Sequence, residues 1–195
     1  MRDQIKTVAT ELLITKGVRG LRFADIADQL AITRANIHYH FGTKDKLVEE
    51  VIDDYVEATL GLFAANWQAP GLSFREKVQR KMALKRERYD RYNPSGKSGS
   101  PWSLITRIRL EADPVSDQAR RTLAHFTRTI ETYIDAAVRS AVESGELVPE
   151  APANDIAVQL IAIVDSAGSI TQDSGSFDRL ERLYTAYLQI IHHAY

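Results

Sequence analysis

The sequence predicts an all-α protein, and three observations lead to this fold class. Apolar residues recur at spacings of three and four through most of the 195 residues, as on one face of a helix. No segment combines strand-like alternation with hairpin signals, and no repeat period or low-complexity tract is present. The composition, 44% hydrophobic and 26% charged residues, is that of a globular protein. We therefore expect helices joined by short breaks around a buried core.

The N-terminal third contains four expected helices, at residues 2–16, 23–30, 33–41 and 43–67. Gly17 ends the first, because glycine is the usual residue after a helix C-terminus. Thr33 and Thr43 are expected to cap the third and fourth helices, since a threonine hydroxyl accepts a hydrogen bond from a free amide of the first turn. The expected breaks therefore coincide with residues that favour them.

The rest of the chain contains five expected helices, at residues 73–91, 103–112, 115–143, 154–174 and 177–195. Ala69-Pro70-Gly71 and Ser144-Gly145 break the pattern between helices. Residues 93–101 contain two prolines and two glycines and form the most loop-like stretch of the chain. The expected architecture is thus a small N-terminal helical domain followed by a larger helical one.

Composition excludes several classes of protein. The chain has no cysteine, so neither disulfides nor thiolate metal sites are expected. The longest apolar stretches, such as residues 157–164, are far shorter than the roughly 20 residues of a membrane-spanning helix. The N-terminus lacks the apolar block of a signal peptide. We expect a cytoplasmic protein that does not enter the membrane.

Charge is distributed unevenly along the chain. Residues 1–47 contain eight basic and five acidic residues, residues 73–110 contain eleven and three, and residues 111–195 contain six and thirteen. The acidic C-terminal part is therefore not expected to contact phosphates. For the basic helix at residues 73–91 a solvated face is the main interpretation; an acidic ligand or partner, or a non-specific attraction to DNA, is the alternative.

Residues 23–41 have the pattern of a helix-turn-helix. Two short helices that cross steeply need a small residue at the crossing, here Ala27, and apolar residues on both inner faces. Those apolar residues are Ile26, Leu30, Ile32 and Ile37. Thr33 caps the second helix, whose free N-terminal amides then favour a phosphate.

The residues expected on the outer face of this second helix suit DNA. Arg34 can pair with guanine edges or phosphates, and Asn36 can pair with adenine edges. Tyr39 and His40 can reach phosphates or bases. DNA binding is therefore the function that these residues favour, with an ordinary helical hairpin as the alternative.

Residues 5–52 resemble the N-terminal domain of the TetR family, on three groups of residues at the family's spacing. These are Gly17, the segment Asp25-Ile26-Ala27, and the segment Ile37-His38-Tyr39-His40-Phe41 followed by Lys44. The resemblance implies that residues 33–41 enter the major groove and that Lys44 meets a backbone phosphate. It implies a DNA-binding domain at residues 1–50 and a ligand-sensing and dimerisation domain at residues 51–195. The expected DNA contacts are Arg22, Thr33, Arg34, Ala35, Asn36, His38, Tyr39, His40 and Lys44.

Three positions depart from the family pattern. Arg22 replaces the usual Ser or Thr cap of the second helix, so this cap is expected to be missing, although the arginine can contact phosphate instead. Ala31 replaces the usual glycine of the turn, where a left-handed backbone would cost on the order of 1 kcal/mol. His38 replaces a usual tyrosine, which would make a phosphate contact sensitive to pH.

The resemblance also implies an effector pocket and a homodimer formed mainly by the last two helices. Aromatic residues of the central helices are candidates for lining the pocket, with plain core packing as the alternative: Tyr89, Tyr92, Trp102, Phe126 and Tyr133. Apolar residues of the last two helices are candidates for the dimer interface, with core packing again as the alternative: Leu160, Val164, Leu180, Tyr184, Tyr187 and Ile191.

The main hypothesis is a homodimeric regulator, a repressor that a small-molecule effector releases from a palindromic operator. The helix from Thr43 to Trp67 would pass the effect from pocket to DNA. An adaptor with a vestigial DNA-binding head is the alternative. An enzyme has little support, because no nucleophile triad, phosphate loop or dinucleotide loop is present. No cofactor or metal is expected, since His38 and His40 lie on different sides of a helix and the adjacent His192 and His193 do not converge.

Overall fold

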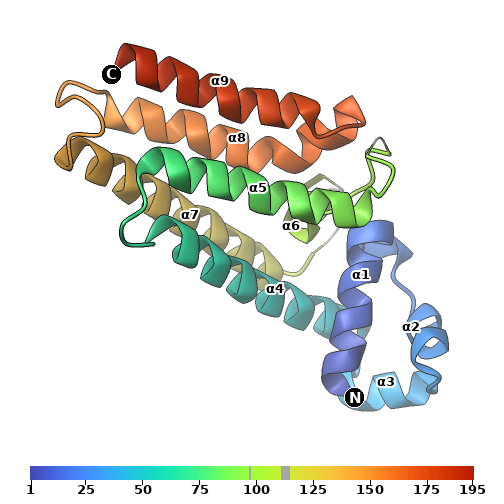
Figure 1. The fold of residues 1–195 in the computed structure, drawn as a ribbon. Coiled ribbons are helices and arrows are strands. Elements are labelled where there is room, and N and C mark those ends of the chain that lie inside the picture. The colour runs from blue at the N-terminus through green and yellow to red at the C-terminus, as the bar shows by residue number, and fades with distance from the viewer. Residues whose placement is uncertain (97, 111–114) are drawn as a thin grey trace. The chain divides into compact units, whose positions relative to one another are not determined.

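The computed structural model describes residues 1–96, 98–110 and 115–195, which form helices joined by turns (Figure 1). The all-α prediction is confirmed over these residues. The chain divides into two compact units. The N-terminal unit comprises residues 1–58 and 101–125, and the C-terminal unit comprises residues 59–100 and 126–195. The functional domains that we predict, residues 1–50 and 51–195, are a different division and stay a prediction.

The N-terminal unit contains helices α1 (Arg2–Gly20), α2 (Phe23–Leu30), α3 (Arg34–Phe41) and α6 (Leu104–Leu110). The first parts of α4 (Lys44–Trp67) and α7 (Asp117–Glu143) also belong to it. Gly17 has φ 71° and ψ 178°, so the regular helix is interrupted where the sequence predicts its end, and one further turn continues to Gly20. The unit has a compact apolar core, whose fully buried members include Ile5, Leu13, Ile26, Ile37 and Leu47.

The turn between α2 and α3 contains one residue in the left-handed conformation. Ala31 adopts the left-handed conformation, with φ 52° and ψ 43°, and it is the one residue other than glycine with positive φ in the described part of the chain. Two residues later the Thr33 hydroxyl accepts a hydrogen bond from the Asn36 amide at 3.2 Å. The Thr43 hydroxyl accepts one from the Lys46 amide at 3.2 Å. Both predicted threonine caps are thus confirmed.

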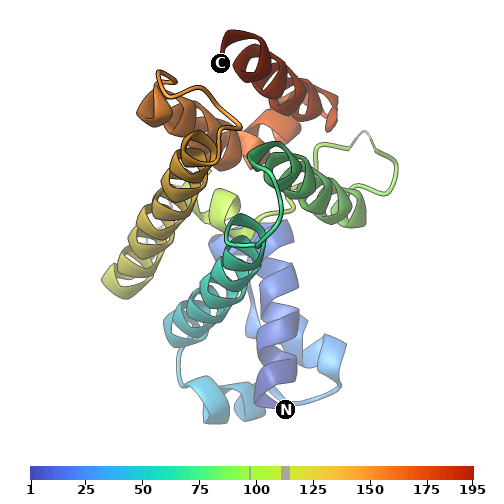
Figure 2. The same cartoon turned by 60° about the vertical axis from the view of Figure 1, so that its left-hand side comes forward.

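The C-terminal unit contains α5 (Phe74–Tyr92), α8 (Ala153–Ser174), α9 (Asp178–Ala194) and the second parts of α4 and α7. Helices α8 and α9 lie side by side in both views (Figures 1 and 2). Ser73 begins α5 through a capping box with Glu76. The Ser73 amide donates a hydrogen bond to the Glu76 carboxylate, and the Ser73 hydroxyl accepts one from the Glu76 amide. The first of these bonds lowers the pKa of the Glu76 carboxyl.

A second carboxylate also caps α5 from a distant point of the chain. Glu146 accepts hydrogen bonds from the amides of Phe74 at 2.6 Å and Arg75 at 2.9 Å. These amides have no partner within their own helix, so the carboxylate satisfies donors that the helix leaves free. The loop after α7 is thereby joined to the start of α5.

The helix boundaries agree with the sequence to within a few residues. The helix expected at residues 103–112 is described from Leu104 to Leu110, and its last expected residues lie outside the described ranges. The helix expected from residue 115 begins at Asp117. Within the described residues no helix combines the length and the apolar character that crossing a membrane requires.

Candidate nucleic-acid interface

Helix α3 presents its polar side chains from a firmly anchored backbone. Ile37 and Phe41 are 0% and 5% exposed and fix one side of the helix in the core of the N-terminal unit. On the other side Tyr39 is 86% exposed, and Arg34 is also exposed. The Thr33 cap fixes where the helix begins. The arrangement leaves a short helix with an exposed arginine in its first turn and an exposed tyrosine in its last.

The other expected contacts of α3 are more constrained than the sequence suggests. Asn36 is half-buried, and its Oδ1 is buried without a partner in the described structure, so this side chain faces outward less than expected. The His38 Nδ1 lies 2.9 Å from the Gly42 carbonyl oxygen, and its ring meets that of Phe23 edge to face at 4.8 Å. The Gly42 contact leaves the opposite ring nitrogen, Nε2, as the atom with which His38 would reach a phosphate.

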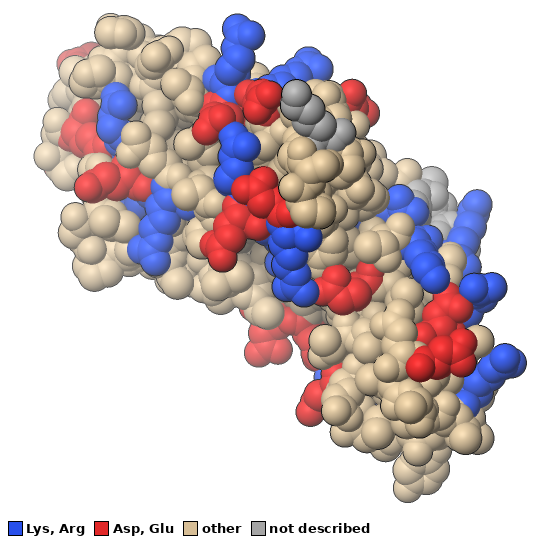
Figure 3. Space-filling model, turned by 45° about the vertical axis from the view of Figure 1, so that its right-hand side comes forward, with Lys and Arg blue, Asp and Glu red and all other residues tan. Residues whose placement is uncertain are grey.

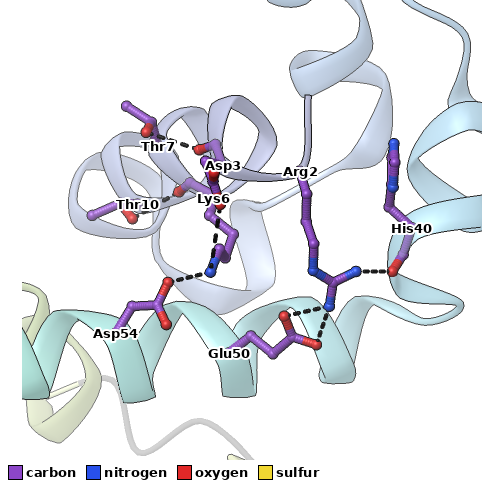
Figure 4. A network of polar contacts seen from close by, with 8 residues as sticks. All are labelled: Arg2, Asp3, Lys6, Thr7, Thr10, His40, Glu50 and Asp54. Carbon is purple, nitrogen blue, oxygen red and sulfur yellow. Dashed lines mark hydrogen bonds and ion pairs between the residues drawn. The ribbon is translucent and has the colours of Figure 1, made fainter.

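Arg2 joins the C-terminal end of α3 to α4 (Figure 4). Its Nη1 donates to the carbonyl oxygen of His40, and its Nη2 donates to both carboxylate oxygens of Glu50 at 2.6 Å. The guanidinium carbon lies 4.3 Å from the centre of the Phe41 ring. One side chain from α1 therefore contacts the backbone of α3, an anchor residue of α3 and an acid of α4.

A second ion pair joins α1 to α4 without reaching α3. Lys6 pairs with Asp54, and this hydrogen bond raises the pKa of the Lys6 ammonium group (Figure 4). Asp3 lies 4.0 Å from the same ammonium. The contacts of Arg2 were not expected from the sequence, because the residues involved are 38 and 48 positions apart and no local pattern links them.

Arg22 occupies the N-cap position of α2 and makes no capping hydrogen bond through its side chain, as the sequence predicts. The side chain pairs with an acidic residue instead. Its Nη2 lies 2.9 Å from Asp25, which also accepts from Lys16 at 2.9 Å. The hydrogen bond from Lys16, followed by that from Arg22, lowers the pKa of the Asp25 carboxyl. The Arg22 side chain is still 71% exposed, so its guanidinium remains accessible to a phosphate.

The remaining expected DNA contacts lie at helix starts. Ala35 is exposed in the first turn of α3, and Lys44 is the first residue of α4, directly after the Thr43 cap. A lysine beside free helical amides adds a charge to donors that already favour an anion. On the face shown in Figure 3, basic side chains lie beside acidic ones and do not form one continuous basic surface.

The candidate pocket residues are distributed over both units. Tyr89, Tyr92, Phe126 and Tyr133 belong to the C-terminal unit and Trp102 belongs to the N-terminal unit. Tyr89 is fully buried, with its hydroxyl 3.4 Å from the carbonyl oxygens of Gly96 and Gly175. Phe126 meets Phe63 edge to face at 5.9 Å. Tyr92 and Tyr133 are half-buried.

All six candidate residues of the dimer interface are buried within the single chain, at 0–5% exposure, and pack α8 and α9 into the C-terminal unit: Leu160, Val164, Leu180, Tyr184, Tyr187 and Ile191. The Tyr187 hydroxyl, for example, donates to the Ile156 carbonyl oxygen at 2.9 Å. Exposed apolar residues of the same helices lie elsewhere: Val158 is 64% exposed, Leu183 36% and Ile190 63%. A shallow hollow on α9 lies beside Ile190 and is also lined by Ala186 and His193.

The chain is similar to known proteins in its N-terminal sequence and in its fold. Residues 5–51 match the family model for bacterial regulatory proteins of the tetR family. Over 62 residues the chain is 29% identical to the HTH-type transcriptional repressor KstR2 of Mycolicibacterium smegmatis, an alignment that covers 32% of this chain and 30% of that protein. The chain thus matches under a third of the length of this curated relative.

Solved structures resemble the chain over almost all its length. A TetR-family transcriptional regulator from Agrobacterium tumefaciens has a TM-score of 0.83 at 19% identity, covering 97% of this chain and 96% of that one. A TetR transcriptional regulator from Legionella pneumophila has a TM-score of 0.74 at 23% identity, covering 98% and 97%. At these identities the likeness concerns the fold, and it agrees with the match of residues 5–51. Residues 5–51 thus match the tetR family of bacterial regulatory proteins, and the chain has the fold of the solved TetR-family regulators.

Proposed function

We propose that the chain is a homodimeric transcriptional repressor that binds a palindromic operator through α3 and leaves it when a small-molecule effector binds the C-terminal unit. The observation that carries the DNA-binding part is the anchored helix α3, with exposed Arg34 and Tyr39 on a backbone capped by Thr33. The relative KstR2 is named as a transcriptional repressor, which favours the negative sign of regulation.

A dimer is supported by the size of α3. Eight residues of helix give few base contacts, and a twofold dimer doubles them on a palindromic site. Because the six expected interface residues are occupied within the chain, the second copy would meet the outer face of α8 and α9. This face carries Val158, Leu183 and Ile190.

Release requires a ligand with different affinities for two states of the protein. Roughly 5.5 kcal/mol of differential binding would change the DNA-competent fraction from 99:1 to 1:99. Helix α4 is one uninterrupted helix of 24 residues that contributes to both units, which supports its expected role in passing on the effect.

The direct test is selection of genomic fragments on the purified protein at near-physiological salt, followed by sequencing. An enriched palindrome is the expected result, and the genes beside it would limit the identity of the effector. Retention of fragments without a shared motif would instead favour the adaptor with a vestigial DNA-binding head.

A further inference from the structure

The buried side of α5 contains two lysines. The residues that face the interior of the C-terminal unit follow helical spacing: Phe74, Val78, Lys81, Lys85 and Tyr89. Lys81 is 6% exposed, less than many apolar residues of the chain. An ammonium group in the interior is costly unless an anion or several hydrogen bonds compensate it. The two lysines thus interrupt an otherwise apolar stripe.

Lys85 has a partner, since its Nζ donates to the Val164 carbonyl oxygen at 2.7 Å, with Asp165 near enough to favour the charge. Lys81 differs. Its Nζ lies 3.2 Å from the centre of the Phe63 ring, and in the described structure no carboxylate pairs with it. Burial, followed by the charges of Lys85 and Arg88, lowers the pKa of Lys81 well below its usual value. The two charges that lower the pKa of Lys81, those of Lys85 and Arg88, are both positive.

The Phe63 ring, over which the Lys81 ammonium group lies, belongs to an aromatic pair formed by two other helices. The Phe63 ring on α4 meets the Phe126 ring on α7 edge to face at 5.9 Å, and both residues are about 5% exposed or less. The Asn66 side chain, one turn later on α4, donates to the Lys77 carbonyl oxygen at 3.1 Å. Among the described residues the Lys81 ammonium group lies over the Phe63 ring, and a ring face is a weak substitute for an anion.

A buried hydroxyl without a partner lies at the same level along α5. Tyr184 is 1% exposed, and its hydroxyl has no hydrogen-bond partner in the described structure. One turn later Tyr187 meets Phe74, and one turn earlier Glu181 pairs with Arg86 at 2.6 Å. Tyr184 is therefore level with the middle of α5, where Lys81 lies. The unit thus holds a buried cation and a buried hydroxyl donor that no acceptor uses.

We propose that the interior of the C-terminal unit binds a small organic acid, whose carboxylate is neutralised by Lys81 and whose apolar body packs against Phe63 and Phe126. The carboxylate would take the place of the Phe63 ring face over Nζ. Tyr184 is the second donor that the acid would use. The inference rests on the proposed function only in that the bound acid would be the effector.

The test is calorimetric titration of the full chain with octanoate and benzoate, each compared with its amide, octanamide or benzamide. The paired ligands have nearly the same shape and differ in charge. Lys81→Met retains the length of the side chain without the ammonium group. Arg80→Met removes a charge from an exposed position of the same helix and is the matched control. Circular dichroism confirms that each variant is folded.

At least one acid is expected to bind about tenfold more tightly than its amide. This preference should disappear in Lys81→Met and persist in Arg80→Met. Binding should also be accompanied by proton uptake, measured in buffers of different ionisation enthalpy, because an anion raises the pKa of a buried lysine. The uptake should be lost in Lys81→Met, even though Lys85, Arg88 and the Tyr184 hydroxyl remain.

Equal binding of acid and amide, retention of the preference in Lys81→Met, or no binding at millimolar concentration would each overturn the inference. An acid that binds but does not release the selected operator would leave the site in place and refute its role as the effector site. If a palindrome is enriched from genomic DNA but no acid binds, the DNA-binding function is supported and the acid site is refuted.

Discussion

Arg2 donates to both carboxylate oxygens of Glu50 at 2.6 Å and to the carbonyl oxygen of His40. His40 is the penultimate residue of α3, and Glu50 lies on α4, so the arginine fixes the end of the proposed recognition helix. Because Arg2 contacts the main-chain carbonyl of His40 and not its imidazole ring, its influence on DNA binding would be through position. Arg2 is thus a positioning residue.

Arg2→Ala is expected to lower operator affinity by about three- to tenfold, equivalent to roughly 0.7–1.4 kcal/mol. The cost in unfolding free energy should stay near 1 kcal/mol, because the Arg2 side chain is 43% exposed. Fluorescence anisotropy and urea unfolding measure the two quantities. Lys6→Ala is the control, since it removes an ion pair between α1 and α4 without touching α3. Equal losses of affinity in both variants would contradict the positioning role.

Arg34→Ala and Asn36→Ala are each expected to weaken binding to the operator by about 1–3 kcal/mol and to leave binding to random DNA nearly unchanged. Lys44→Ala should weaken both and lower the salt dependence by about one ion, because a phosphate contact carries no sequence information. Titrations of both DNAs at several salt concentrations separate these cases. If the arginine and asparagine variants lose affinity equally on operator and random DNA, base recognition is excluded.

Ala31→Gly is expected to raise the free energy of unfolding by roughly 0.5–1 kcal/mol. The residue holds a left-handed backbone at φ 52°, where a Cβ atom is unfavourable. Urea unfolding is the measurement. Ala35→Gly, at an exposed helical position of α3, should lower stability by about 1 kcal/mol instead. A loss of stability in Ala31→Gly would show that the turn is not strained.

Lys85→Met is expected to stabilise the protein in a pH-dependent way. Burial lowers the pKa of this lysine from 10.5 to about 7, so the folded state holds a costly charge at low pH and releases the proton earlier than the unfolded state. The gain should be on the order of 3 kcal/mol, fully present below the folded pKa. It should decline as the pH rises from about 7 towards 10.5. Urea unfolding across this range tests it, and a gain independent of pH would contradict it.

Ile190→Asp is expected to weaken the proposed homodimer by at least about tenfold in Kd. Ile190 is 63% exposed on α9. In a twofold interface the substitution is present on both subunits, so its effect on the free energy of association is doubled. Analytical ultracentrifugation measures the Kd. Leu62→Asp, at a 57% exposed residue of α4, is the matched control and should leave the dimer intact. Unchanged association of the Ile190 variant would place the interface elsewhere.

The sequence predicts those features that depend on neighbouring residues. The Thr33 and Thr43 caps and the interruption at Gly17 each follow from a few adjacent positions. The apolar spacing also identifies Ile37 as an anchor of α3. Such local patterns account for the helices and for most of the surface of α3.

Contacts between distant residues were not predictable in this way. Nothing around Arg2 indicates Glu50, because only the packing of α1 on α4 brings them together. The basic composition of α5 favours a solvated face, whereas Lys81 and Lys85 turn into the unit. The apolar stripes of α8 and α9 fit a core or an interface equally well from the sequence alone. In the structure their residues are buried within the chain, as Tyr184 is at 1% exposure.

Residues 93–100 look like an obvious place to insert a reporter or an affinity tag, since they are rich in glycine, serine and proline. Asn93 argues against this choice. Its amide group donates to the carbonyl oxygens of Tyr89 and Ser100 and accepts from the Ser100 amide, and it is only 1% exposed. A side chain at Gly99 would meet the Gln172 carbonyl oxygen at 3.0 Å. The exposed Gly71, with nothing within 4 Å of its added Cβ, is the better insertion point for an engineered biosensor.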